Sequence, residues 1–315
     1  MLCCTSSILR KIKITLAVTC LSLTCTFTSL ASEYISAGEQ YSNIGIVECP
    51  KFLNIRQQPT TESAIVGIIP NGGVVEVKRT GDLWYAVKSG DISGYVLKEY
   101  LVTGTKAESL AEQYSIKKIR FNSLGSIYAA KNKSSKVWDR PITGSTYNVI
   151  EDIGDWVTID LDSAIGYISK DEDITYYMGL ETAMPYYNVS NVSEQRKDVI
   201  KYAMKFLGKP YVWGGNDPNT GADCSGFVRY CYWHSAEVWL PRVSYEQCNV
   251  GELRTSMEML PGDLIYYANQ EGTVGHVAMY IGNGTILHAA SKASGVKLSQ
   301  WNYRTPKYIR SVLPD

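Results

Sequence analysis

The sequence predicts a multidomain protein in which two small all-β domains precede an α+β domain. Three observations indicate this order. Short runs of β-branched and aromatic residues, separated by Gly-, Asn- and Asp-rich turns, fill residues 42–177. Two landmarks in this stretch recur further along the chain at one common spacing. From residue 193 onwards, two helical patterns are followed by four strand-like segments. A chain of 315 residues has room for two or three domains.

The N-terminus is predicted to be an export signal that is cleaved off. Arg10, Lys11 and Lys13 precede an uncharged stretch, residues 14–31, which ends in the small-x-small pattern Ser29-Leu30-Ala31. We therefore expect residues 1–31 to be removed and the mature protein to be secreted, with no stable membrane insertion. A retained anchor is the alternative, because 18 residues are borderline for spanning a bilayer. The Thr, Ser and Cys content of the stretch disfavours an anchor.

Charge and cysteine content narrow the class of protein. Lys plus Arg and Asp plus Glu both number 31, so the net charge of zero gives no expectation of nucleic-acid binding. Four cysteines remain after residue 31, which is too few for a disulfide framework in so long a chain. One bridge between Cys231 and Cys248 is an open alternative. We expect most of these cysteines to be small buried side chains and one to take part in a chemical reaction.

The β region contains an internal repeat. Gly81-Asp82-Leu83-Trp84 recurs as Gly154-Asp155-Trp156, and Gly94-Tyr95-Val96 recurs as Gly166-Tyr167-Ile168. The tryptophans and the glycines are both offset by 72 residues. Equal offsets at two landmarks predict two copies of one module. The expected boundaries are residues 42–104 and residues 115–177.

The last part of the chain, residues 193–315, is predicted to be α+β, after a linker at residues 178–192. One helix is expected to start near Ser193, which can cap it, and to end before Gly208 and Pro210. A second helix is expected from Cys224 to about Ser235. An antiparallel sheet is then expected from four strands, at residues 264–267, 274–281, 286–290 and near 308–312.

One cysteine and all three histidines of the chain lie in this last part and form the candidate chemistry. Cys224 opens a predicted helix after a Gly-rich loop, where unpaired N–H groups carry partial positive charge. Such sites lower a cysteine pKa to roughly 3.5–7.5, so we expect a reactive thiol. A buried, inert side chain is the alternative. His234 lies ten residues further on and is interpreted as a packing or helix-end histidine.

His276 and His288 lie on the two arms of a hairpin predicted around Gly282-Asn283-Gly284. A two-residue Asn-Gly turn would put the two histidines on opposite faces of the sheet. A three-residue loop would pair Ala278 with His288 and put both histidines on one face. A Cys–His site needs the second register, so we predict an odd-length loop.

In that register His276 takes the thiol proton, and His288 holds the first imidazole in its tautomer and orientation. A packed strand histidine is the alternative for His288. The spacing of the cysteines and histidines matches no zinc motif, and we expect no metal or other cofactor.

Five segments of this region resemble the NlpC/P60 cysteine peptidases in content and order: Tyr211–Gly215, Asp223–Val228, Pro261–Leu264, Gly275–Gly282 and Ile286–Ala289. The resemblance covers about residues 194–314. It implies a papain-like fold and a triad of Cys224, His276 and His288. It also implies a peptidoglycan hydrolase of the cell wall or extracellular space that cuts stem peptides next to γ-D-glutamyl residues. Substrate contacts are implied at Tyr211, Trp213, Asp223, Ser225 and Ser244.

The β modules resemble bacterial SH3-like (SH3b) domains. The first has their order of landmarks: Leu53-Asn54-Ile55-Arg56, Pro59, Asp-x-Trp and Gly-Tyr-Val. The second has Ile127-Tyr128-Ala129 in place of the Asn-x-Arg element. The resemblance implies two small barrels that bind cell-wall peptides or shape the cleft of a neighbouring enzyme. Spacer domains are the alternative.

Arg242-Val243-Ser244 departs from the Arg-Asp-Ser of recycling-type relatives, whose Asp binds the free amine of an N-terminal L-alanine. Val243 cannot form that ion pair, so we expect intact wall stems, rather than freed peptides, to be the substrate. Two alternatives to this function stay open. One is a cell-wall cysteine amidase that cuts between sugar and L-alanine, and the other is a non-catalytic wall-binding protein.

Overall fold

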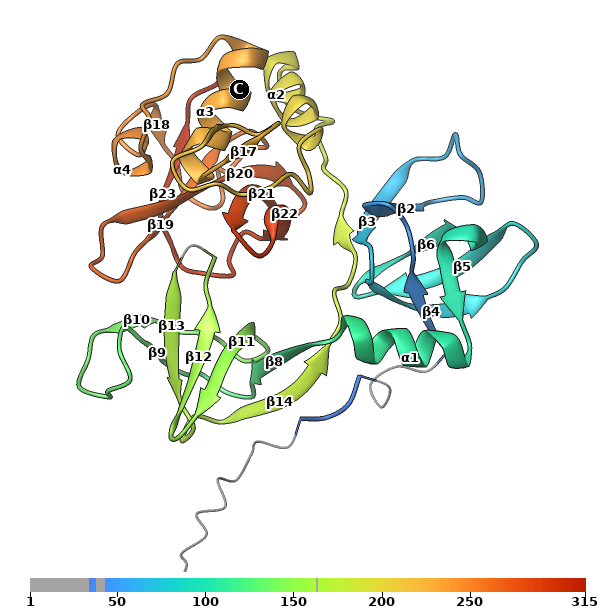
Figure 1. Ribbon diagram of the computed structural model, residues 1–315. Helices are drawn as coiled ribbons and strands as arrows, with labels where there is room; N and C mark the ends of the chain where they lie inside the picture. The colour runs from blue at the N-terminus through green and yellow to red at the C-terminus, as the bar shows by residue number, and fades with distance from the viewer. Residues whose placement is uncertain (1–33, 38–42, 163) are drawn as a thin grey trace, which may run out of the picture. The chain divides into compact units, whose positions relative to one another are not determined.

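The computed structural model describes residues 34–37, 43–162 and 164–315 (Figure 1). The predicted signal at residues 1–31 lies outside this part of the chain. Within the described ranges, no helix combines the length and the apolar character that crossing a membrane requires.

Residues 44–103 form the first β module. Alternation of buried and partly exposed residues along Phe52–Arg56 is typical of a strand with one face on a core, and Leu53 and Ile55 pack there against Val96. The sheet order is β15-β3-β2-β6-β5-β4-β1-β7. The strands of this module are β1 (Ile44–Val47), β2 (Phe52–Arg56), β3 (Ile65–Pro70), β4 (Val74–Arg79), β5 (Trp84–Ser89), β6 (Ile92–Leu97) and β7 (Leu101–Thr103).

Residues 116–179 form the second β module. Its sheet order is β10-β9-β13-β12-β11-β8-β14. Strand for strand, this is the order of the first module without β15. The equal order confirms the repeat that the 72-residue offset predicted. The strands are β8 (Ile116–Phe121), β9 (Ile127–Tyr128), β10 (Val137–Asp139), β11 (Thr146–Ile153), β12 (Trp156–Asp160), β13 (Ile165–Ser169) and β14 (Ile174–Gly179).

Two segments beside the modules differ from expectation. A helix that the sequence analysis did not predict, α1 (Thr105–Tyr114), buries Ala107 and Ala111 against the first module. Part of the expected linker is the strand β15 (Met184–Pro185), which pairs with β3. The Ala183 N–H also donates to Ser89 Oγ at 2.9 Å, so this stretch is held on the first module.

Residues 194–311 form the α+β region, whose six-stranded sheet is antiparallel throughout and has the order β18-β23-β19-β20-β21-β22. Its strands are β18 (Glu252–Leu253), β19 (Leu264–Ala268), β20 (Val274–Gly282), β21 (Thr285–Ser291), β22 (Gly295–Gln300) and β23 (Pro306–Ser311). Its helices are α2 (Glu194–Met204), α3 (Cys224–Ala236) and the short α4 (Ser244–Gln247). A small hairpin, β16 (Asn216–Asp217) and β17 (Gly221–Ala222), precedes α3. Neither β22 nor β18 was expected from the sequence pattern.

Helix α2 starts where predicted, but not through the predicted cap. Ser193 occupies the N-cap position without a side-chain bond to the helix, and its hydroxyl donates to the Pro314 carbonyl at 3.0 Å. Arg196, which is fully buried, donates to Asp263 Oδ1 at 2.8 Å. These bonds join the first turn of α2 to distant segments of the same region, so the helix start is held by tertiary contacts.

The six-stranded sheet is covered on both faces. On one face, Val277, Met279 and Leu287 pack with residues of α2 and α3 (Figure 1). On the other face, Tyr267 and Ala278 belong to a second apolar cluster. A sheet buried on both faces can keep polar groups between its layers away from bulk water. The candidate chemical groups lie on β20 and β21 and at the start of α3.

Candidate active site

The start of α3 is held by the side chain of Asp223. Its Oδ1 accepts a hydrogen bond from the Gly226 N–H at 2.7 Å, as an N-cap carboxylate does, and its Oδ2 accepts from the Gly214 N–H at 3.0 Å. Cys224 is the first residue of the helix. A side chain at position 226 would place its Cβ 2.1 Å from the Gly215 carbonyl oxygen, so the loop approaches the helix as closely as a glycine allows.

The Cys224 thiol is buried between the helix start and strand β20. Cys224 is 6% exposed. Its sulfur is hydrogen-bonded to the backbone of Val277, the residue after His276. Burial, followed by the Asp223 carboxylate, raises the pKa of Cys224 to about 11. The expected low pKa is therefore wrong, because the loss of hydration outweighs the backbone hydrogen bonds that favour a thiolate.

The hairpin between β20 and β21 reaches the required register by a route that was not predicted. Gly282 pairs with Thr285, so the turn is the two-residue Asn283-Gly284, with φ of 51° and 71°. The prediction of an odd-length loop is wrong. A β-bulge between Tyr280 and Gly282 inserts one residue and shifts the pairing to Tyr280 with Ile286 and Met279 with Leu287. By the same register, Ala278 lies opposite His288.

The bulge puts both imidazoles on one face and in contact. His276 Nε2 and His288 Nδ1 are 2.8 Å apart and share a hydrogen bond. Both residues are buried. Burial, together with His288 and Arg304, lowers the pKa of His276 well below its usual value. Burial, Lys297 and Arg304 do the same to the pKa of His288. Both imidazoles are therefore neutral at physiological pH.

Residues that the sequence analysis missed surround the outer nitrogen of His288. His288 Nε2 lies 3.0 Å from Ser299 Oγ on β22 and 3.9 Å from Asp162 Oδ2. Asp162 Oδ1 lies 2.8 Å from Lys297 Nζ. Apolar residues alternate with polar ones from Val296 to Ser299, and this strand signal could have identified β22. No local signal identifies Asp162, because it belongs to the second β module.

An arginine organises the predicted substrate residues near Cys224. Arg242 donates to both carboxylate oxygens of Asp223, at 3.0 and 2.7 Å, and to Ser225 Oγ at 3.0 Å. This bidentate pair occupies the Asp223 carboxylate together with the helix cap. Ser244 is buried at the start of α4. Gln247 of the same helix donates to the Ser225 carbonyl at 3.1 Å.

The aromatic candidates lie on the loop before β16. Tyr211 is buried and forms a β-bridge with Ala222, two residues before the cysteine. Trp213 is 76% exposed. Tyr211 is therefore buried close to the start of α3, whereas Trp213 is exposed to solvent.

The remaining cysteines and His234 have structural surroundings. Cys49, Cys224, Cys231 and Cys248 are free thiols in the described part of the chain, so Cys231 and Cys248 are not bridged. His234 stacks on Tyr230 with ring centroids 3.9 Å apart, and its Nδ1 lies 2.8 Å from the Tyr230 carbonyl oxygen.

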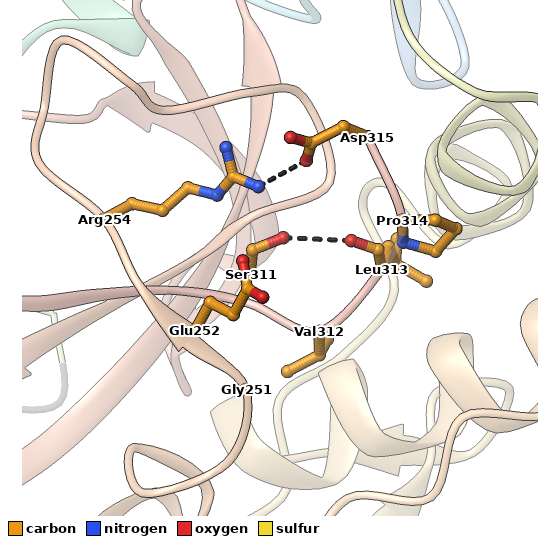
Figure 2. A pocket seen from close by; sticks show the side chains of 8 residues that line it. All are labelled: Gly251, Glu252, Arg254, Ser311, Val312, Leu313, Pro314 and Asp315. Carbon is orange, nitrogen blue, oxygen red and sulfur yellow. Dashed lines mark hydrogen bonds and ion pairs between the residues drawn. The ribbon is translucent and has the colours of Figure 1, made fainter.

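A pocket beside the end of β23 lies apart from this chemistry. It is lined by residues 251, 252, 254 and 311–315, and an ion pair between Arg254 and Asp315 lies at its edge (Figure 2). Neither Cys224 nor a histidine lines it. The candidate site consists of Cys224, which is bonded to the Val277 backbone, and of the His276–His288 pair on β20 and β21, and it is not this pocket.

Comparison with known proteins assigns two parts of the chain. Residues 208–312 match the model of the NlpC/P60 family, and residues 51–102 match that of the bacterial SH3 domain. A gamma-DL-glutamyl hydrolase of Bacillus subtilis is 37% identical over 116 residues, 36% of this chain and 27% of that protein. The murein DD-endopeptidase MepH of Escherichia coli is 32% identical over 113 residues, 35% of this chain and 42% of that protein.

A third relative is the gamma-D-glutamyl-L-lysine dipeptidyl-peptidase of Bacillus cereus. It is 39% identical over 114 residues, which are 36% of this chain and 33% of that protein. In each of these three cases the match spans less than half the length of the curated relative.

Proposed function

We propose that this chain, which carries an NlpC/P60 domain at residues 208–312 and a bacterial SH3 domain at residues 51–102, is a cysteine peptidase of peptidoglycan. One arrangement carries the proposal. Cys224 begins a helix and is hydrogen-bonded to the backbone of Val277, and the preceding residue, His276, is hydrogen-bonded to His288. A thiol at a helix start and a histidine that is oriented by a third polar residue are the groups that nucleophilic catalysis needs.

The proposed mechanism starts from a neutral thiol and a neutral imidazole. In the tautomer that carries the proton on Nε2, His276 donates to His288 Nδ1, and its Nδ1 is the basic nitrogen. As sulfur attacks the peptide carbonyl, the S–H proton passes to His276 Nδ1. The imidazolium then gives this proton to the leaving amine, and a thioester remains. Water, deprotonated by the same nitrogen, then attacks the thioester carbonyl. The C–S bond breaks, the new carboxyl group leaves with the product, and the proton returns from His276 to the Cys224 sulfur. General acid–base catalysis of this kind raises the reaction rate roughly 10²–10⁴-fold.

The Cys224 backbone N–H and the Tyr211 hydroxyl are the proposed donors to the oxyanion. One such donor is typically worth about 2.7–4 kcal/mol. The exposed Trp213 ring is proposed to contact the stem peptide. Asp223, Ser225 and Ser244 are proposed to line the adjoining subsite. There, the Arg242 bond network keeps Asp223 and Ser225 beside the nucleophile.

The proposed substrate is the stem peptide of intact wall, cut between γ-D-glutamate and the diamino acid. Two of the relatives carry glutamyl-bond hydrolysis in their names, and a third is named as a DD-endopeptidase. The predicted signal at residues 1–31 and these wall hydrolases support action outside the cell. The two β modules are proposed to bind the wall or to shape the cleft.

Digestion of purified peptidoglycan tests the proposal. The mature protein and its Cys224→Ala variant are incubated with walls, and the soluble fragments are identified by mass spectrometry. We expect fragments that end in D-glutamate from the wild type and none from the variant. Cleavage between sugar and L-alanine would assign an amidase. Wall binding by both proteins without release of fragments would assign a binding protein.

A further inference from the structure

The loop between β12 and β13 brings a carboxylate of the second β module to the histidine pair. Asp162 is 5% exposed. Its Oδ2 lies 3.9 Å from His288 Nε2, which is too long for a hydrogen bond, but at this distance the carboxylate charge acts on the N–H dipole of the neutral imidazole. Its Oδ1 forms an ion pair with Lys297 Nζ at 2.8 Å.

Arg304 holds this loop in place. The buried guanidinium donates to the Leu161 carbonyl at 2.9 Å and to the Asp162 carbonyl at 3.4 Å. It also lies over the rings of Tyr267 and Trp138, with centroid distances of 5.5 and 5.2 Å. Tyr267 pairs with His276 on the neighbouring strand. The same side chain therefore touches both the backbone of Asp162 and the residue beside the base.

Three further bonds join the second module to the α+β region. Trp138 Nε1–H donates to the Ala268 carbonyl at 3.3 Å, and Thr305 Oγ1–H donates to Asp139 Oδ1 at 2.6 Å. Gln270 Nε2–H donates to the Ile165 carbonyl at 2.7 Å. Trp138 and Asp139 precede the Asp162 loop in the chain, and Ile165 follows it. The bonds therefore hold the chain on both sides of this loop.

The negative charge of Asp162 offsets the positive charges of Lys297 and Arg304, which act on the histidines. Lys297 lies opposite His288 on β22, and Arg304 follows that strand. Burial opposes the charge of Lys297, but Asp162, Glu181 and Asp160 outweigh this effect, raise its pKa and keep it protonated. Both cations oppose protonation of His276, whereas Asp162 favours it. The charged and titratable groups that act on the pair or contact it are Asp162, Tyr267, Lys297, Tyr303 and Arg304, and Asp160 and Glu181 act on Lys297.

Asp162 also sets the direction of the hydrogen bonds. A carboxylate near His288 Nε2 favours a proton on that nitrogen, which then donates to Ser299 Oγ. His288 Nδ1 is then an acceptor for Nε2–H of His276. His276 Nδ1 is left without a proton, as a general base requires.

We propose that Asp162 is a positioning residue for the catalytic histidines, so that the second β module completes the active site of the α+β region. It acts on His276 through the tautomer of His288, and it compensates the charge of Lys297. This inference rests on the proposed function, because it assigns Asp162 to the same site.

The first test compares matched variants on peptidoglycan. Asp162→Asn keeps the shape of the side chain and removes its charge. Asp155→Asn makes the same change at an exposed position of the same module. We expect Asp162→Asn to lower kcat several-fold with little change in KM, because Asp162 favours protonation of His276 and its loss weakens the general base. Asp155→Asn should leave kcat unchanged.

The double variant separates an electrostatic role from a merely structural one. Removal of Lys297 in Asp162→Asn/Lys297→Met deletes the cation that the carboxylate compensates. We expect it to recover several-fold of the lost kcat. If Asp162 serves only to attach the module, loss of its ion-pair partner recovers nothing, and that result would overturn the proposal. Ser299→Ala perturbs His288 Nε2 without changing the second β module. We expect it to lower kcat less than Asp162→Asn does.

A tautomer measurement gives a readout that does not depend on turnover. The chain has three histidines, so ¹⁵N-histidine labelling gives few signals. At neutral pH, the wild type should show the Nε2–H tautomer for His276. Asp162→Asn should reduce the population of this tautomer and leave the exposed His234 unchanged. Inactivity of the wild type on walls would refute the proposed function. An active wild type whose kcat and tautomers are the same in Asp162→Asn would refute only the role of Asp162.

Discussion

At the scale of single residues, opposing influences act on the Cys224 thiol. The first turn of α3 offers N–H groups that favour a thiolate, but burial and the Asp223 carboxylate raise the pKa to about 11. Burial also lowers the pKa of His276. Both shifts favour the thiol–imidazole pair over the thiolate–imidazolium pair. Proton transfer must therefore accompany the attack on the substrate, instead of preceding it.

The neutral pair predicts how alkylation of Cys224 depends on pH. The rate of reaction with iodoacetamide should rise steadily between pH 6 and pH 9, because the thiolate fraction grows about tenfold per pH unit below the pKa. The modified peptide is quantified by mass spectrometry, which separates Cys224 from Cys49. Urea-unfolded protein is the control and should titrate near the ordinary cysteine pKa. A rate that is already maximal at pH 6 would indicate a preformed thiolate instead.

The three histidines should differ in their effect on turnover. His276→Ala should lower kcat by about 10²–10⁴-fold, because the general base is lost. His288→Ala should lower it less, and His288→Gln should retain more activity than His288→Ala, since a glutamine oxygen can still accept from His276. His234→Ala is the control, because His234 contacts the rings of Tyr202 and Tyr230 and the Tyr230 carbonyl oxygen. Full activity in His276→Ala would contradict its assignment.

Val243 predicts how the enzyme treats the substrate amine. Since valine cannot pair with an ammonium group, stem tripeptides with a free and with an acetylated L-alanine should be cleaved at comparable kcat/KM. Product formation is followed by liquid chromatography with both peptides at the same concentration. A strict requirement for the free amine would instead favour freed peptides as the substrate.

At the scale of elements, two short features position the site. The cap at Asp223 and the close approach at Gly226 fix the start of α3 against the loop at residues 214–215. The bulge between Tyr280 and Gly282 sets which face of the sheet carries the histidines. The sequence pattern located both elements within a residue or two. It could not locate the bulge, because the Asn283-Gly284 turn is equally compatible with a hairpin that has none.

The close approach at Gly226 predicts a sensitive position. In Gly226→Ala the new Cβ would meet the Gly215 carbonyl oxygen, so either the loop or the helix start must move. We expect a loss of about 1–3 kcal/mol in the free energy of unfolding, measured by urea denaturation. The kcat should fall as well, because Cys224 moves with the helix start. The control is Ser235→Ala near the other end of α3, where kcat should not change.

At the scale of the whole chain, one module occurs twice and has two different uses. The first module adds the segment β15 to its sheet. The second extends the loop with Leu161 and Asp162 to the α+β region, where Arg304 binds it. Equal strand order therefore does not give the two copies equal roles, because their loops differ.

Two buried neutral imidazoles predict a loss of stability in acid. The folded pKa values of His276 and His288 lie well below the unfolded value of about 6.5, so the unfolded chain binds more protons below that pH. The contribution of the two imidazoles to stability should be constant between about pH 7 and pH 8, and stability should fall by up to about 1.4 kcal/mol per pH unit for each imidazole as the pH drops below 6.5. Urea denaturation between pH 5 and pH 8 measures this slope.

The double variant His276→Gln/His288→Gln is the control for this slope. Its free energy of unfolding should change less with pH between pH 5 and pH 6.5 than that of the wild type. An equal slope in both proteins would show that carboxylates, and not these histidines, cause the acid sensitivity.

The sequence by itself determined the features that depend on local pattern. The 72-residue offset identified the two β modules, the residues after Gly221 identified the start of a helix at Cys224, and the apolar runs located four of the six strands of the last sheet. Only the tertiary structure decided the pKa of Cys224, the bulge that brings His276 to His288, and the approach of Asp162. Burial, register and contacts between distant segments depend on how the whole chain packs, and no short stretch of sequence contains that information.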